Sequence, residues 1–140
     1  MRNVTIRVMI ALAAVFLLIP GCGGKYDDAI AVNDQFVEAV ETYCSEMEKA
    51  EGTDDIAGAL NNFAAEVEKL APKMKAVAEK YPELNAPDQI PDELKESQAR
   101  AAEVGMKMAG HMMKAAANMR DAGVKEAQIR MQKALASMGK

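Results

Sequence analysis

The chain is poor in aromatic residues and in cysteine. Its 140 residues include no Trp, one His, three Phe, three Tyr and two Cys. Two cysteines are too few for a fold held by a disulfide framework. The longest apolar run, Val8–Ile19, has 12 residues and falls short of the ~20 that a helix needs to cross a bilayer. Ala, Met, Glu, Lys and Leu dominate the remainder, and all of them favour helix, so we expect an all-α protein.

The chain also lacks the basic surface that nucleic-acid binding needs. The net charge is −4, and it falls to −6 when residues 1–21, which carry Arg2 and Arg7, are left out. This acidic balance excludes general binding to nucleic acid. The 119 residues that follow residue 21 are enough for one domain and too few for two.

The first 22 residues have the pattern of an export signal. Arg2 and Arg7 supply a positive start, Val8–Ile19 supplies a short apolar core, and the core ends at Pro20-Gly21-Cys22. The segment Leu18–Cys22 resembles the lipobox of bacterial lipoproteins, in which an apolar residue stands three positions before the cysteine and a small residue directly before it. Ile19 and Gly21 match those positions.

The lipobox resemblance implies a lipid anchor on Cys22, with cleavage after Gly21 and acylation of the new amino terminus. Two or three acyl chains of the palmitate type make a stable membrane anchor. Gly23 is not the aspartate of the inner-membrane retention signal, so the resemblance favours the periplasmic face of an outer membrane. The alternative is an ordinary secretory signal with an unmodified cysteine. The predicted organisation is a signal peptide at 1–21, a lipidated tether at 22–27 and a helical domain at 28–140.

Four segments after the tether show the apolar spacing of amphipathic helices. We expect helices at about 28–50, from Thr53 or Asp54 to residue 81, at about 91–122, and from 124 onward. Gly52 is expected to cap the first helix and Gly123 to end the third. The inward residues are predicted to be Ile30, Asn33, Val37, Val40, Cys44 and Met47; then Ile56, Leu60, Phe63, Val67, Leu70, Met74 and Val77; then Leu94, Gln98, Ala101, Gly105, Met108, Met112, Ala115, Met119 and Ala122; and last Val124, Ala127, Met131, Leu135 and Met138.

Short turns between four such helices predict an antiparallel up-down-up-down four-helix bundle. In that topology the first helix lies beside the fourth. The charges agree with this pairing, since residues 26–51 carry a net −7 and residues 99–140 a net +5.

Residues 47–128 resemble the cytochrome b562 type of four-helix bundle. The likeness is carried by Glu48-Lys49-Ala50, by Ile56–Leu60 and by Val124–Gln128 after a Gly turn. The family implies a b-type haem held by a Met in the first helix and a His in the last. Neither ligand carries over, because Val37 stands at the Met position and the chain ends at Lys140 before the His position. The resemblance therefore predicts the fold without its cofactor.

Cys44 would be a single thiol if Cys22 is lipidated. It falls on the apolar stripe of its helix, where a small buried hydrophobe is expected. An intermolecular disulfide, or a Cys22–Cys44 bridge in unlipidated protein, is the alternative.

One cluster has ligand chemistry: Met106, Met108, His111, Met112 and Met113. Thioether and imidazole suit soft ions such as Cu(I), and Met108, His111 and Met112 share a helical face. The alternative is that Met108, Met112 and Met119 only fill the core. Met106 and Met113 fall beside the predicted stripe, so we expect them to be exposed, where they mark either a metal-capture surface or a partner surface.

Catalysis has less support in the sequence. With one histidine, there is no nucleophile–His–acid set with helpful context, and no Glu-x-x-His pair for a di-iron centre. The sequence thus favours a non-enzymatic, lipid-anchored helical module of the cell envelope that contacts an unknown envelope protein. A soft-metal protein using His111, Met108 and Met112 is the second hypothesis, and a haem-binding bundle is the third.

Overall fold

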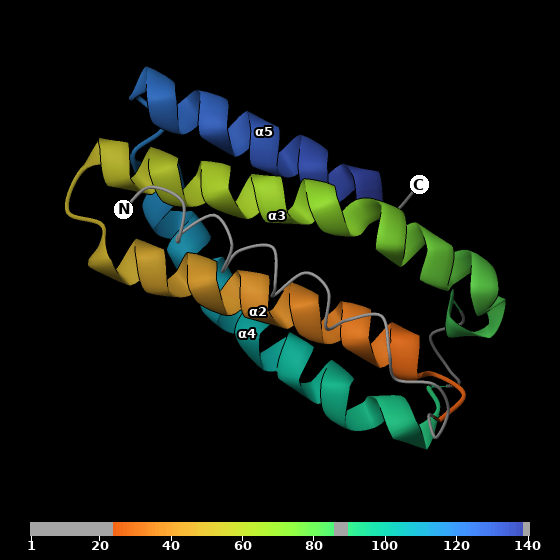
Figure 1. Ribbon diagram of the computed structural model, residues 1–140. Coiled ribbons are helices and arrows are strands. Elements are labelled where there is room, and N and C mark those ends of the chain that lie inside the picture. Colours follow the sequence, from red (N-terminus) through yellow and green to blue (C-terminus); the bar gives the residue numbers. More distant parts are fainter. Residues whose placement is uncertain (1–23, 86–89, 139–140) are drawn as a thin grey trace, which may run out of the picture.

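The computed structural model describes residues 24–85 and 90–138. In this part of the chain four α-helices and one 3-10 helix follow each other: α2 (Asp27–Lys49), α3 (Thr53–Lys80), η2 (Pro82–Asn85), α4 (Asp92–Ala117) and α5 (Ala122–Met138) (Figure 1). The predicted all-α four-helix bundle is confirmed. The signal segment and Cys22 lie outside the described residues. None of the described helices is both long enough and apolar enough to span a membrane.

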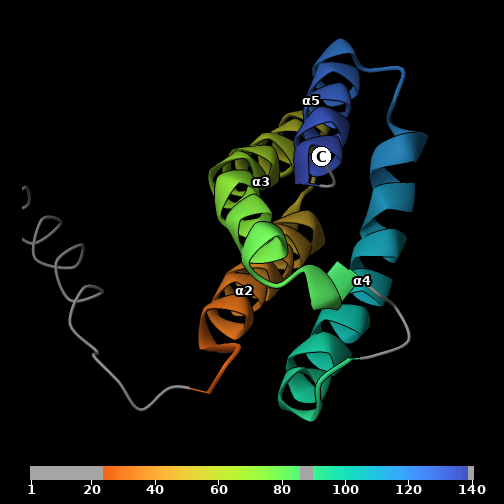
Figure 2. The ribbon, with the colours of Figure 1, turned by 90° about the vertical axis from the view of Figure 1, so that its right-hand side faces the viewer.

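Polar pairs between helices define how they run. Asp28 pairs with Lys80 and Glu46 with Asn62, so α2 and α3 are antiparallel. Along α2 and α4 the residue numbers rise together, from the Asn33–Ser97 pair to the contact of Lys114 with Ala50, so these two helices are parallel. The same holds for α3 and α5, where Gly123 lies near Ala57 and Arg130 binds Glu68. Figure 2 shows the α2–α3 hairpin with α4 and α5 on the side that faces away from the start of the described chain.

The expectation that the first helix lies beside the fourth is wrong. The main packed pairs are α2 with α3, α2 with α4, and α3 with α5. Opposite charges still face each other, but across different pairs of helices. Arg100 of α4 lies 3.6 Å from Asp34 of α2, and Arg130 of α5 lies 2.8 Å from Glu68 of α3. The opposite charges noted in the sequence therefore pair between the parallel helices, α4 with α2 and α5 with α3.

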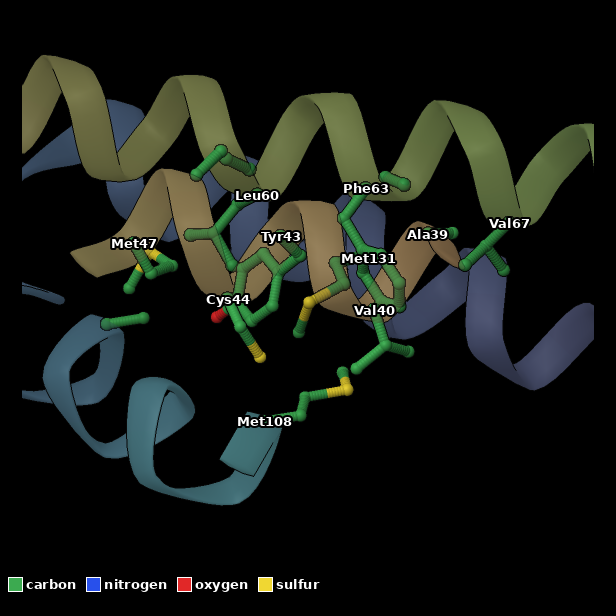
Figure 3. Close-up of a cluster of buried hydrophobic side chains, with 14 of the residues drawn as sticks. Ala39, Val40, Tyr43, Cys44, Met47, Leu60, Phe63, Val67, Met108 and Met131 are labelled. Carbon is green, nitrogen blue, oxygen red and sulfur yellow. The ribbon is translucent and has the colours of Figure 1, made fainter. Parts of the chain in front are cut away.

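The core follows the apolar stripes of α2, α3 and α5 closely. Val37, Val40, Leu60, Val67 and Met131 are buried, as their spacing predicts. Figure 3 shows Val40, Leu60, Val67 and Met131 meeting between the helices. Tyr43 lies among them, and its ring packs 5.2 Å from that of Phe63. α3 continues through Pro72 without a break.

The predicted inward positions of α4 agree less well with the structure. Gln98 and Gly105 were expected to be buried and are exposed. Ser97 and Val104 are buried instead. The reason is the polar layer between α2 and α4, in which the Asn33 side-chain amide donates to Ser97 Oγ at 2.6 Å and to the Ser97 carbonyl at 3.0 Å. A partly buried polar pair of this kind favours one register, because any other alignment leaves it without partners.

Two predicted helix ends are also wrong. α4 ends at Ala117 and not near 122, because Asn118 donates its side-chain amide back to the Lys114 carbonyl and Asp121 accepts from Val124 N at 3.1 Å. These side chains compete with the helical hydrogen bonds, so the break falls before Gly123, which lies inside α5. Gly52 precedes α3 in an extended conformation and does not cap α2.

The carboxyl end of α2 is instead covered by α4. The Lys114 ammonium donates to the Met47 and Ala50 carbonyls at 2.7 and 2.9 Å. These carbonyls are left over at a helix end, and a cation there also suits the helix dipole.

A second, smaller core closes the end of the bundle nearest residue 24. It contains Tyr26, Ala29, Tyr81 and Leu94. The Tyr81 hydroxyl lies 2.6 Å from Asp28 Oδ1, and Lys80 donates to Asp28 Oδ2 at 2.6 Å, so both hold the pKa of that carboxyl below its ordinary value, Lys80 most of all. The beginning of α2 is thereby tied to the end of α3.

Candidate functional site

The structure divides the predicted Met/His cluster between the inside and the outside of α4. Met108 is buried, whereas His111 and Met112 are half-buried. The His111 side chain is 21% exposed, and its Nε2 lies 3.8 Å from Glu48 Oε1. Met106 and Met113 are 73% and 75% exposed, which confirms that they point to solvent. Metal binding by His111, Met108 and Met112 stays a prediction, because nothing in this geometry tests it.

Met108 faces other sulfur atoms within the core. Cys44 of α2 is a buried free thiol whose pKa is raised by burial, as its stripe position indicated. In Figure 3 the sulfur ends of Cys44, Met108 and Met131 are directed into the same interior region. The sequence alone did not predict this grouping, because the grouping depends on the parallel alignment of α2 and α4 that places Cys44 beside Met108. Within residues 24–85 and 90–138, no group of three His, Cys, Asp or Glu side chains is arranged to hold a metal ion.

A groove of about 660 Å³ runs between α2 and α3 over Tyr43, Phe63 and Leu70. Its rim carries both signs of charge, and two of these groups bond to the opposite helix: Lys73 donates to Gln35 at 2.8 Å, and Glu46 accepts from Asn62 at 3.1 Å. Because acidic and basic side chains are mixed along the rim, the groove favours no single class of ligand.

The most unusual surface is the side of α4 that points away from the core. We call it the α4 outer face. All of its residues are exposed and none is charged. Seven of the ten are Ala or Gly, two are Met and one is Gln. It comprises Gln98, Ala99, Ala102, Gly105, Met106, Ala109, Gly110, Met113, Ala116 and Ala117.

The α4 outer face departs from what a solvent-facing helix surface normally carries. Such a surface is rich in charged and polar residues, and a helix without them on either side is usually covered on both. The face runs for about 28 Å at 1.5 Å per residue. Its Met106 and Met113 are two of the four large exposed hydrophobic residues in the described part of the chain.

From Arg100 onward, the charged residues of α4 gather on the flank that faces α2. Arg100 lies near Asp34, His111 lies near Glu48, and Lys114 covers the end of α2. Lys107 binds Glu103 on the same flank, and this hydrogen bond raises the pKa of Lys107. The charges are thus engaged within the bundle, and the α4 outer face is left without them.

Two glycines on the α4 outer face have no explanation within the bundle. Gly105 and Gly110 lie inside an unbroken helix, where each costs about 1 kcal/mol relative to Ala. Apart from the helix's own backbone, no described atom lies within 4 Å of a Cβ placed on either residue. Neither position needs a glycine for a close contact with the residues that the structure describes.

The sequence contained the signal for this face. Ala99, Ala102, Met106, Ala109, Met113 and Ala116 alternate in steps of three and four, the spacing of a helix-packing stripe. Only the two methionines stand out in the sequence, because alanine is frequent along the whole of this helix.

Val37 occupies the position of the missing haem-ligating Met and is fully buried in the apolar core. The position of Lys140 lies outside the described residues. Comparison of the chain with protein-family models, with curated proteins and with solved structures gave no match.

Proposed function

We propose that this protein is a lipid-anchored, non-catalytic interaction module of the bacterial cell envelope, held to the membrane through Cys22 and acting through the α4 outer face. The observation that carries the proposal is the face itself: ten exposed, uncharged residues opposite the core. Exposed apolar surface that is continuous over several helical turns marks contact sites in soluble domains.

The anchor part of the proposal rests on the lipobox residues Ile19, Gly21 and Cys22. Cys22 precedes Gly24 by two residues, so the anchor would lie near the bundle end where Tyr26 and Tyr81 pack. The periplasmic face of an outer membrane is the proposed location in a host that has one, since Gly23 follows the cysteine.

Metabolic labelling with an alkyne-bearing palmitate tests the anchor. We expect the full chain to be labelled and to fractionate with membranes, and the Cys22→Ser variant to lose both properties. Cys44→Ser is the matched control, because Cys44 is buried and should not affect labelling. Equal labelling of the wild-type and Cys22→Ser chains would sink the anchor proposal.

Photo-cross-linking in intact cells tests the contact surface. A photoreactive residue at position 106, on the α4 outer face, should give adducts with protein. The same residue at Gln132, which is exposed on α5 away from this face, is the control and should give none. Equal yields at both positions, or no adduct at 106, would overturn the proposal that the α4 outer face is the contact surface.

Soft-metal binding is the second candidate, and the sulfur grouping around Met108 favours it. An anaerobic Cu(I) titration of the Cys22→Ser chain against a chromophoric chelator tests it. If metal is bound through the predicted ligands, His111→Ala and Met108→Leu should each weaken competition at least about tenfold. If the interior sulfur atoms bind the ion instead, Met108→Leu and Met131→Leu should weaken it and His111→Ala should not. Failure to compete with the chelator would retire this candidate.

A further inference from the structure

The α4 outer face is complementary to itself in one alignment. When two copies of α4 run antiparallel with the two-fold axis between Lys107 and Met108, all six stripe positions find a partner. Met106 then lies opposite Ala109 of the second copy, Met113 opposite Ala102, and Ala99 opposite Ala116. Each central layer pairs one large side chain with one small one, which lets two helices keep a constant separation.

Other alignments fit less well. In a parallel pair each residue meets its own copy, so two Met–Met layers would alternate with Ala–Ala layers and the helices could not stay equally close. An antiparallel shift of one heptad in either direction reduces the six layers to four. In one direction it also sets Met113 against Lys95 of the second copy, and in the other it leaves Ala99 and Ala102 without stripe partners. The number of filled layers therefore selects the alignment centred between 107 and 108.

The two unexplained glycines agree with this alignment. Gly105 and Gly110 lie two and a half residues on either side of the axis, where the two helices would come closest. Small residues let two helix backbones approach each other, and both glycines have open space outside their own helix. A close second helix accounts for glycine at positions where the isolated bundle would be more stable with alanine.

The extent of the uncharged helix bounds the pairing. α4 ends at Ala117, directly after the last stripe position, Ala116. At the other end the next stripe position outward from Ala99 is Lys95, which is charged and exposed, so the uncharged contact ends there.

We infer that the partner of the α4 outer face is a second copy of this chain, bound antiparallel through the same face. The inference rests on the proposed function, since it names the partner of the surface proposed there. A strip about 28 Å long and roughly 10 Å wide gives about 300 Å² per chain. The total of about 600 Å² is below the ~1,200 Å² of stable complexes. The pairing is therefore weak in dilute solution and forms where the anchor concentrates the chains on one membrane.

Disulfide trapping in membranes tests the inference. Full chains carrying Ala102→Cys and full chains carrying Met113→Cys, with tags of different size, are co-expressed, and the isolated membranes are oxidised. Within one chain the two positions are about 16 Å apart along the helix, so they cannot bridge. The wild-type chain and a Gln132→Cys chain serve as controls for Cys22, for Cys44 and for random collision.

The mixture should give a cross-linked heterodimer, and each single variant alone should give at least about tenfold less homodimer. Homodimers of Ala102→Cys chains alone would overturn the antiparallel alignment. No cross-link in any combination would overturn the second copy as partner. If the photoreactive residue at 106 still gives adducts with a different protein, the proposed contact function survives that loss. If it gives none, both fail together.

Discussion

Replacing Gly105 and Gly110 with alanine should affect the stability of the bundle and the pairing through the α4 outer face in opposite directions. Both glycines are exposed inside α4, and a Cβ at either position meets open space beyond the helix's own backbone. Removing the glycine penalty should therefore raise the free energy of unfolding by about 0.8–1.0 kcal/mol per site, or about 2 kcal/mol for the pair. For a chain of this size that corresponds to a rise in Tm of roughly 6–12 °C.

Urea unfolding of the dilute Cys22→Ser chain, followed by circular dichroism, measures this effect. Gly58→Ala is the matched control, because Gly58 lies inside α3 and a Cβ there also meets open space. All three substitutions should raise the midpoint by similar amounts without changing the slope. Only the α4 substitutions should reduce cross-linking in membranes, since only they widen the space between the paired helices.

A loss of stability in Gly105→Ala or Gly110→Ala would refute the reasoning. It would mean that these glycines are needed inside the bundle, and they would then give no support to a second helix packed on the α4 outer face. If Gly58→Ala reduced cross-linking as much as the α4 substitutions, the reduction would not be specific to the α4 outer face.

Three further predictions concern the core and the pH dependence of stability. Tyr43→Phe should stabilise the protein by about 1 kcal/mol in urea unfolding at pH 7, because the buried Tyr43 hydroxyl has no hydrogen-bond partner among the described residues. Burial also raises the pKa of Tyr43 from 10.0 to about 12. The stability that comes from keeping this hydroxyl protonated is complete below pH 10 and is lost as the pH rises through 12. Tyr43→Phe should therefore lose less stability than the wild-type chain between pH 10 and 12. Asn33→Ala should cost about 1–2 kcal/mol by leaving the Ser97 hydroxyl poorly paired, and the double variant with Ser97→Ala should cost less than the sum of the two singles; additivity in this cycle would contradict the coupled polar layer. Lys80 is the main cause of the lowered pKa of Asp28, and the resulting stability is present above pH 3.8 and is lost as the pH falls through the folded pKa. Asp28→Asn should therefore reduce the fall of the urea midpoint at acid pH. An unchanged fall would argue against a stabilising Asp28–Lys80 pair.

Regular spacing made the helices and most of the core predictable. The stripes of α2, α3 and α5 identified the buried residues because their inward positions are large and aliphatic. In α4 the prediction was wrong by one residue at Gln98 and Gly105, since Ala, Gly and Ser carry little hydrophobic signal and Ser97 and Val104 are buried instead. The Asn33–Ser97 hydrogen bonds turn Ser97 inward, and they connect positions 64 residues apart in the sequence.

The relative placement of the helices could not be derived from the stripes. Short turns and opposite charges suggested that the first helix lies next to the fourth, but charge balance does not specify which helices touch. Helix ends were missed for a local reason, because Asn118 and Asp121 make side-chain hydrogen bonds that end α4 and begin α5 without a glycine. The exposure of Met106 and Met113 was predicted correctly, whereas the uncharged character of the whole outer face appears only when burial is known.

The most direct test of the central claim, that the α4 outer face is covered in the envelope, is the rate of thiol labelling at Met113→Cys. The rate with a hydrophilic maleimide is compared between intact membranes and the dilute Cys22→Ser chain, with Gln132→Cys as the control on α5. The account predicts that labelling at 113 slows at least about tenfold in membranes while labelling at 132 is unchanged. Equal rates at 113 in both preparations would contradict it.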